Sequence, residues 1–193
     1  MDNPDQVFGY TIGLQEVLWI KYGCKTIDDV IDGARERLKQ TCLDIYLLLA
    51  PSKGFEYYWG DLLRFKEQGK AKTIGVCRFY VNQLQIIKNR YGVYPAINQI
   101  EVHPYYSNTK LINFCKEKGI AVEARSVFTH GEALGGLMKE KTLIKIANDC
   151  DKTVPQIIIR WIVQKGLIAI VKSETEQHIK DNIEVFDFYL TES

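Results

Sequence analysis

The sequence has no long hydrophobic run. Its longest unbroken apolar stretch covers residues 45–50, far short of the about 18 residues that a membrane-spanning helix needs. The first residues are acidic and polar, so no signal or transit peptide is expected. An excess of one charge sign is also lacking, because 25 Lys and Arg stand against 24 Asp and Glu. The chain therefore has no general attraction to nucleic acid or to a membrane, and neither partner is expected.

Paired cysteines and metal-ligand spacing are missing as well. The five cysteines are odd in number and scattered, and none belongs to a CxxC pair. This pattern argues against a disulfide framework and a zinc site, and it favours a reducing, cytoplasmic setting. The three histidines, His103, His130 and His178, lack the spacing of metal ligands, so no metal is expected.

Short β-rich runs alternate with amphipathic helical patterns along the chain. Each run has four to six residues, is rich in Ile, Val, Leu or Tyr, and is bounded by Gly, Pro or charged residues. Thr26 with Asp29, and Thr153 with Gln156, are typical of capping boxes at helix starts. The predicted strands are 17–20, 44–49, 73–77, 96–100, 121–124 and 167–171.

Repeated strand–helix units imply a parallel sheet with right-handed crossovers. Neither GxGxxG nor the glycine-rich phosphate loop ending in Gly-Lys-Ser/Thr follows any predicted strand. A closed barrel is therefore favoured over an open doubly wound sheet. Eight βα units usually need about 250 residues, and about six fit here. We predict an α/β fold of (β/α)8 TIM-barrel type, incomplete, as one domain over residues 1–193 with an unmatched N-terminal segment, 1–15.

Polar and cationic residues follow the predicted strands, at the end where parallel barrels carry their reacting groups. As a set they suit an anionic cofactor, although polar residues mark strand ends in any soluble α/β protein. Lys172 and Ser173, before the last helix, form either a phosphate site or a solvated helix start. The Gln99 amide could pair with a carboxamide ligand or bridge two strands. The set is Lys21, Cys77, Arg78, Asn98, Gln99, His103, Arg125, Ser126, Lys172 and Ser173.

These residues, taken in order, resemble the aldo-keto reductases, which are NADPH-dependent (β/α)8-barrel enzymes. The most specific stretches are 67–76, 96–104 (Ala-Ile-Asn-Gln-Ile-Glu-Val-His-Pro), 114–122 and 170–188. The resemblance runs from about residue 16 to the C-terminus. It implies that the family's first two strands are missing or degenerate here. It also implies open sheet edges, which either the N-terminal segment or a second copy of the chain would cover.

The resemblance implies a dinucleotide site. Lys172 and Ser173 would bind the 2′-phosphate side of NADPH, Asn182 the adenine, Ser126 the pyrophosphate and Gln99 the nicotinamide carboxamide.

Four positions in that site depart from the family. His178 replaces the usual arginine near the 2′-phosphate, which weakens the preference for NADPH over NADH. Cys77 and Arg78 replace the Ser-Asn pair that grips the carboxamide. Arg125 replaces an aromatic that stacks on the nicotinamide. Weak NADP(H) binding is therefore expected.

The catalytic set departs further from the family's tyrosine, lysine, aspartate and histidine. Lys21 matches the lysine, but Leu49 occupies the histidine position and cannot donate a hydrogen bond. Asp5 and Tyr10 have the family's five-residue separation, so Tyr10 is the candidate acid and Asp5 would orient Lys21. A tyrosine titrates near 10, so donating a proton near neutrality requires a neighbouring cation.

Three hypotheses follow. The first is NADPH-dependent reduction of small aldehydes and ketones, with this chain impaired. The second is a catalytically inactive or truncated barrel that retains part of a dinucleotide site. The third is a structural or interaction protein that reuses the scaffold.

Overall fold

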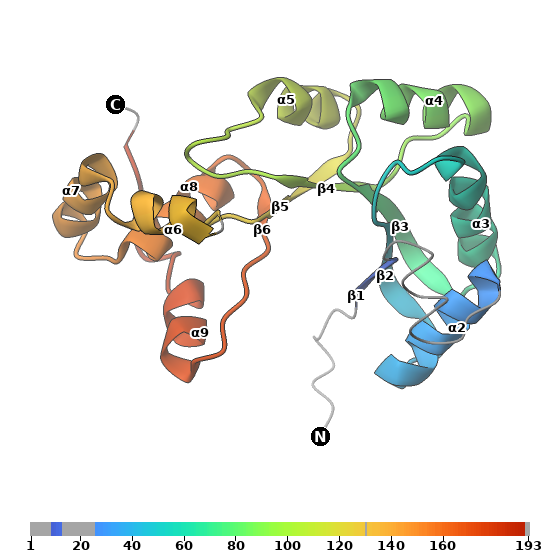
Figure 1. The fold of residues 1–193 in the computed structure, drawn as a ribbon, viewed down its shortest axis with the longest axis horizontal. Helices are drawn as coiled ribbons and strands as arrows, with labels where there is room; N and C mark the ends of the chain where they lie inside the picture. Colours follow the sequence, from blue (N-terminus) through green and yellow to red (C-terminus); the bar gives the residue numbers. More distant parts are fainter. Residues whose placement is uncertain (1–8, 13–25, 130, 192–193) are drawn as a thin grey trace. The chain divides into compact units, whose positions relative to one another are not determined.

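The structure is a computed structural model that describes residues 9–12, 26–129 and 131–191. Strands and helices alternate along most of this range (Figure 1). The strands are β1 (Gly9–Ile12), β2 (Leu43–Leu48), β3 (Ala71–Cys77), β4 (Ile97–Glu101), β5 (Ala121–Arg125) and β6 (Ile168–Ala169). The helices are α2 (Ile27–Leu38), α3 (Phe55–Glu67), α4 (Val81–Tyr91), α5 (Thr109–Glu117), α6 (Gly131–Met138), α7 (Lys141–Asp149), α8 (Val154–Gln164) and α9 (Glu176–Ile183).

Within the described residues the strands hydrogen-bond in sequence order, from β1 to β6. The pairs β1–β2, β2–β3, β3–β4 and β5–β6 are parallel. Sequential order is what a barrel requires, and a doubly wound sheet would reorder the strands. The first strand differs from the prediction, because residues 9–12 pair with β2 while the predicted strand 17–20 lies outside the described residues. Part of the N-terminal segment therefore covers the outer edge of β2.

The chain divides into two compact units, each described here by itself. Unit 1 comprises residues 1–99 and 113–120, and unit 2 comprises residues 100–112 and 121–193. The division runs through β4 and α5, so it follows no linker. The single domain over residues 1–193 stays a prediction.

In unit 1, α3 packs against β2 and β3 (Figure 1), and α2 buries Val30, Ile31 and Ala34. The predicted capping box is confirmed, since the Thr26 hydroxyl accepts from Asp29 N at 3.1 Å and the Asp29 carboxylate accepts from Thr26 N at 2.8 Å. Apolar residues at helical spacing then face inward from α2. The largest buried side chains of this unit are Trp59, Tyr46, Phe65, Phe79, Ile31, Leu43, Leu62, Leu84 and Ile87.

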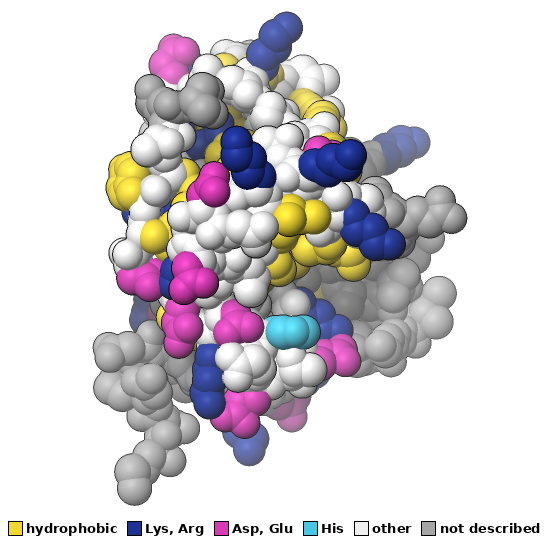
Figure 2. Space-filling model, turned by 90° about the vertical axis from the view of Figure 1, so that its left-hand side faces the viewer, with side chains coloured by type: hydrophobic (Ala, Val, Ile, Leu, Met, Phe, Trp, Pro, Cys, Tyr) yellow, Lys and Arg dark blue, Asp and Glu magenta, His cyan; other side chains and the backbone are white. Residues whose placement is uncertain are grey.

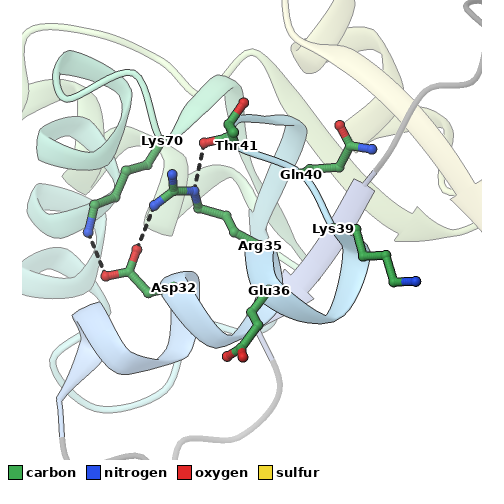
Figure 3. A pocket seen from close by; sticks show the side chains of 7 residues that line it. All are labelled: Asp32, Arg35, Glu36, Lys39, Gln40, Thr41 and Lys70. Atoms are coloured by element: carbon green, nitrogen blue, oxygen red, sulfur yellow. Dashed lines mark hydrogen bonds and ion pairs between the residues drawn. The ribbon is translucent and has the colours of Figure 1, made fainter.

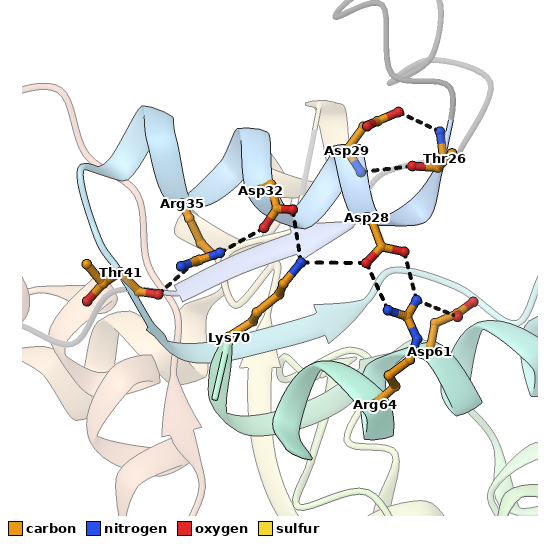
Figure 4. A network of polar contacts seen from close by, with 9 residues as sticks. All are labelled: Thr26, Asp28, Asp29, Asp32, Arg35, Thr41, Asp61, Arg64 and Lys70. Carbon is orange, nitrogen blue, oxygen red and sulfur yellow. Dashed lines mark hydrogen bonds and ion pairs between the residues drawn. The ribbon is translucent and has the colours of Figure 1, made fainter. Parts of the chain in front are cut away.

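A network of charged side chains joins α2, α3 and the start of β3 (Figure 4). Arg64 donates two hydrogen bonds of 2.8 Å to Asp28 and a third, of 3.0 Å, to Asp61. Lys70 Nζ lies 2.9 Å from Asp32 and 3.5 Å from Asp28. The hydrogen bonds from Arg64 hold the pKa of the Asp28 carboxyl below its usual value of 3.8, against the opposing effect of partial burial.

We expect Asp28→Asn to lower the free energy of unfolding at neutral pH by about 0.2–1 kcal/mol, because Asp28 is 41% exposed and water screens the pair. The folded pKa is the lower one, so the stabilisation is complete above the unfolded pKa and is lost as the pH falls through the folded value. Urea unfolding of both proteins at neutral pH and well below pH 3.8 tests this, and the difference should vanish once the pH is below the lowered pKa of Asp28. A difference that stays constant with pH would contradict it.

In unit 2 one face of α8 holds the C-terminal segment through polar side chains. Gln156 Nε2 donates to Asp181 O and Glu184 O, at 3.2 and 3.1 Å. Arg160 donates to Val185 O at 3.1 Å, and Gln164 donates to Leu190 O at 2.9 Å. Positions 156, 160 and 164 are four residues apart and so lie on one face of the helix. The helix itself begins at the predicted capping box of Thr153 and Gln156, which is confirmed.

An apolar groove of about 550 Å³ lies among α8, β6 and α9. Its lining includes Ile168, Ile179, Ile183 and Phe186, which are between 48% and 70% exposed. Figure 2, which views the left-hand side of Figure 1, shows hydrophobic side chains exposed among charged ones. β6 is the last strand of the sheet, with no partner on its outer edge among the described residues. Association of copies through such an edge stays a prediction.

Helices long and apolar enough to cross a membrane are absent from the described part of the chain.

Candidate functional site

The end of β2 carries little of the expected catalytic set. Leu49 follows the strand directly and is half-buried. Asp5 and Lys21 lie outside the described residues. Tyr10 lies in β1 in register with Tyr46, and its side chain is not described. The catalytic roles of Asp5, Tyr10 and Lys21 therefore stay predictions.

The ends of β3 and β4 bring two of the predicted residues together. Cys77 and Gln99 are register partners across the two strands, and Cys77 Sγ lies 3.5 Å from Gln99 Oε1. Cys77 is buried, and Gln99 is half-buried. This is the interstrand hydrogen bond that the sequence left open as an alternative for Gln99.

Arg78 follows Cys77 in left-handed backbone, with φ at 65°. Residues other than glycine adopt this conformation rarely, and such residues gather at functional loops. The turn is fixed because Arg78 N donates to Gln99 O at 2.8 Å. Its side chain is exposed.

The loop after β5 shows the same strain. Ser126 and Thr129 have φ values of 52° and 62°, and Thr129 N donates to Ser126 O at 2.8 Å. The Thr129 hydroxyl is buried and has no hydrogen-bond partner among the described residues. Arg125 ends the strand and is half-buried. Strained backbone and an unsatisfied polar group mark this loop as a candidate site within unit 2.

The start of α9 gathers the residues predicted to hold the phosphate end of a dinucleotide. Lys172 is 84% exposed and its Nζ lies 2.8 Å from the Glu174 carboxylate. The Ser173 hydroxyl accepts from Thr175 N at 3.4 Å, beside the helix start. Ser173 and Asn182 both line the apolar groove, whereas His178 is exposed on α9.

The structure gives Asn98, which belongs to the predicted set, a structural role, and it adds Glu174, which the sequence did not single out. Asn98 is fully buried, and its side-chain amide binds the backbone of Phe79. It donates to the Phe79 carbonyl at 2.8 Å and accepts from the Phe79 N–H at 3.4 Å. Period-two alternation along β4 places Asn98 and Gln99 on opposite faces, and this was the available signal. Glu174 pairs with Lys172, a contact that two-residue spacing alone does not reveal.

A second hollow, of about 490 Å³, lies among charged residues at the amino ends of β2 and β3 (Figure 3). Three of its charged side chains form contacts with one another or with the backbone: Arg35 bonds Asp32 and Thr41 O, and Lys70 bonds Asp32. Reacting groups of parallel barrels lie at the other end of the strands. We therefore infer that the side chains around this hollow stabilise the fold and do not form the functional site. Among the described residues, no group of three or more His, Cys, Asp or Glu is placed to hold a metal.

Comparison with known proteins decides the family. The model of the Aldo/keto reductase family matches residues 20–193. The chain belongs to the aldo/keto reductase family. It is 36% identical to the methylglyoxal reductase DkgA of Yersinia pestis over 163 residues, covering 83% of this chain and 58% of that protein. It is 34% identical to the glyoxal reductase of Bacillus subtilis over 171 residues, covering 88% and 60%.

A solved structure extends the comparison. A variant of Gox0644 in complex with NADPH superposes with a TM-score of 0.88 and is 28% identical, covering 98% of this chain and 68% of that one. The fold is thus an aldo/keto reductase (β/α)8 barrel, incomplete here, as predicted. The chain spans 58% and 60% of the length of these two curated relatives.

Proposed function

We propose that this chain binds NADP(H) and has the carbonyl-reducing site of its family in an impaired form, for small aldehydes and ketones. The observation that carries the proposal is the set at α9, where Lys172 and Ser173 precede the helix and Asn182 lies on it. The NADPH complex of a Gox0644 variant supports a nicotinamide cofactor.

The residues at α9 fit a phosphate group by their chemistry. A lysine ammonium, a serine hydroxyl and the N–H groups of a helix N-terminus are all donors that an anion accepts. Two features weaken the fit. Glu174 already neutralises Lys172, and Glu176 adds a negative charge in the first turn. Binding would therefore exchange one ion pair for another, which favours weak affinity.

When bound, NADPH supplies the hydride that reduces a carbonyl carbon. The chain's own residues would hold and orient the cofactor: Lys172 and Ser173 its 2′-phosphate, with His178 beside them, and Asn182 its adenine. Gln99 would fix the carboxamide and thereby the face of the nicotinamide ring. Ser126 would bind the pyrophosphate, and Arg125 would lie against the ring. The proton would come from Tyr10, with Lys21 lowering its pKa and Asp5 orienting the lysine.

We expect Lys172→Ala to weaken NADPH binding by about 10- to 100-fold, because it removes a charge-assisted hydrogen bond worth about 1.5–3 kcal/mol. Glu174→Gln is the matched variant, since it releases Lys172 from its ion pair and should tighten binding about two- to fivefold. Titration of protein fluorescence with NADPH measures both. An unchanged dissociation constant for Lys172→Ala would show that the phosphate site lies elsewhere.

A binding protein without catalysis is the second candidate. Leu49 favours it, because its side chain has no polar atom with which to polarise a carbonyl. NADPH binding without turnover on any carbonyl would support this second function, whereas measurable turnover would support the first.

A further inference from the structure

Arg125 carries a positive charge that has no partner among the described residues. It ends β5 and is half-buried, and its side chain forms no hydrogen bond, ion pair or ring contact with any of them. Arg64, by contrast, binds two carboxylates, and Arg160 binds Gln164 and the carbonyl of Val185. Burying part of a charge without a partner costs free energy, so an unpaired arginine here indicates a negatively charged ligand.

Arg125 lies at the end of the sheet where barrels of this kind bind their substrates. Its backbone is fixed, because its carbonyl accepts from Val102 N at 3.3 Å. The turn that follows holds Ser126 and Thr129 in left-handed backbone. Thr129 is only 8% exposed, and its hydroxyl has no partner among the described residues. Residues 125–129 thus hold two polar side chains that the rest of the described chain does not satisfy, as expected of a binding site.

The carboxylate that precedes Arg125 on the same strand does not neutralise it. Glu123 lies two residues nearer the amino end of β5, on the same face of the strand. It is 6% exposed and has interactions of its own, none of them with Arg125. A ligand that approaches β5 from its carboxyl end therefore meets the guanidinium before it meets this carboxylate.

Two sources could supply the anion, the phosphates of the cofactor and the substrate. In the proposed function the pyrophosphate lies at Ser126 and the nicotinamide ring at Arg125. The ring has no negative charge and becomes positive when NADPH is oxidised, so it cannot pair with a guanidinium. The substrate lies against this ring, because it receives the hydride there. A carboxylate on the substrate suits Arg125, since it accepts two parallel hydrogen bonds from a guanidinium.

We propose that Arg125 is a specificity-determining residue, which selects carbonyl substrates that carry a carboxylate beside the reacting carbonyl. Glyoxylate is the simplest such compound. Its reduction would transfer a hydride from NADPH to the aldehyde carbon and a proton to the aldehyde oxygen, which gives glycolate and NADP⁺. This inference rests on the proposed function, because it requires that the chain bind NADP(H), and it names the substrate class of that site.

The test compares glyoxylate with glycolaldehyde, a neutral aldehyde of the same carbon number. Both are titrated by calorimetry into the chain saturated with NADP⁺, which has no hydride to give, so binding is measured without reaction. We expect the wild type to bind glyoxylate at least about tenfold more tightly than glycolaldehyde. Arg125→Gln should weaken glyoxylate binding by about 10- to 100-fold, the range for hydrogen bonds to a charged group, and leave glycolaldehyde binding unchanged. Arg125→Lys keeps the charge but loses the paired N–H groups, so its affinity for glyoxylate should lie between the two.

Lys110→Gln is the matched control, because it removes the same charge from an exposed residue of α5. It should leave the affinity for both aldehydes unchanged. An equal loss of glyoxylate binding in Lys110→Gln would reduce the effect to net charge. Equal losses for both aldehydes in Arg125→Gln would make the role of Arg125 merely structural. A matching loss of NADP⁺ affinity in Arg125→Gln would assign the guanidinium to the cofactor's phosphates. Each of these three results would overturn the proposal.

Failure of the proposed function gives a different result. If the wild type does not bind NADP⁺, both the proposed function and this inference are wrong. If it binds NADP⁺ but does not prefer glyoxylate, only the role of Arg125 in substrate selection is wrong.

Discussion

We expect this chain to reduce aldehydes and ketones with NADPH very slowly. Its turnover number should lie at least roughly 100-fold below about 1 s⁻¹, which is the lower end of the range for typical enzymes. Proton donation by a positioned group is worth about 10²–10⁴-fold. Leu49 cannot contribute a proton or a hydrogen bond at the position of the family's histidine. Altered residues 77 and 78 at the carboxamide add a second loss, since small errors in hydride position cost about 100-fold.

The measurement follows NADPH consumption as a decrease in absorbance with time, and the panel of carbonyl substrates includes methylglyoxal and glyoxal. The methylglyoxal reductase DkgA of Yersinia pestis serves as the active control. Turnover near about 1 s⁻¹ would overturn the impaired form of the proposed function. If such turnover were seen and Tyr10→Phe abolished it, Tyr10 would be supported as the acid.

The second prediction with a large expected effect concerns the stability of the sheet at Gly75. Gly75 lies in the middle of β3, in register with Leu47 on one side and Ile97 on the other. A Cβ there would come within 2.6 Å of Ile97 O and 2.7 Å of Leu47 Cδ2. The backbone oxygen cannot move without breaking the pairing of β3 with β4. We expect Gly75→Ala to lower the free energy of unfolding by about 3 kcal/mol.

Gly135→Ala is its control. Gly135 lies within α6, and an added Cβ would meet no atom within 4 Å. Alanine should stabilise this helix by about 0.5–1 kcal/mol relative to glycine. Urea unfolding curves of the two variants and the wild type measure both effects. Equal stabilities would show that β3 and β4 do not pair in this register.

Much of the fold could be predicted, because capping boxes and short apolar runs depend only on residues that are close together in the sequence. Both capping boxes follow from residues three positions apart, and β2 to β6 all overlap their predicted ranges. The strand at residues 9–12 was missed because its sequence, Gly-Tyr-Thr-Ile, contains a glycine and a threonine and so forms no run of apolar residues. It is defined by its pairing with β2, which is a long-range contact.

The candidate site was harder to predict, because its contacts join residues from different strands and loops. Gln99 was selected from the sequence, but its bond to Cys77 depends on the register of β3 against β4. The role of Asn98 depends on where Phe79 lies after the strand. The ion pair of Lys172 with Glu174 depends on the path of the loop before α9.

α9 is anchored by the polar face of α8 and contributes no buried side chain of its own. Elements with so little buried surface open before the core does, so amide hydrogens of α9 should exchange with deuterium sooner than those of α8. A ligand held by Lys172, Ser173 and Asn182 binds only while α9 is docked. Its binding free energy would therefore appear directly as slower exchange in this one helix, and deuterium uptake there becomes a residue-level assay of occupancy that needs no catalysis.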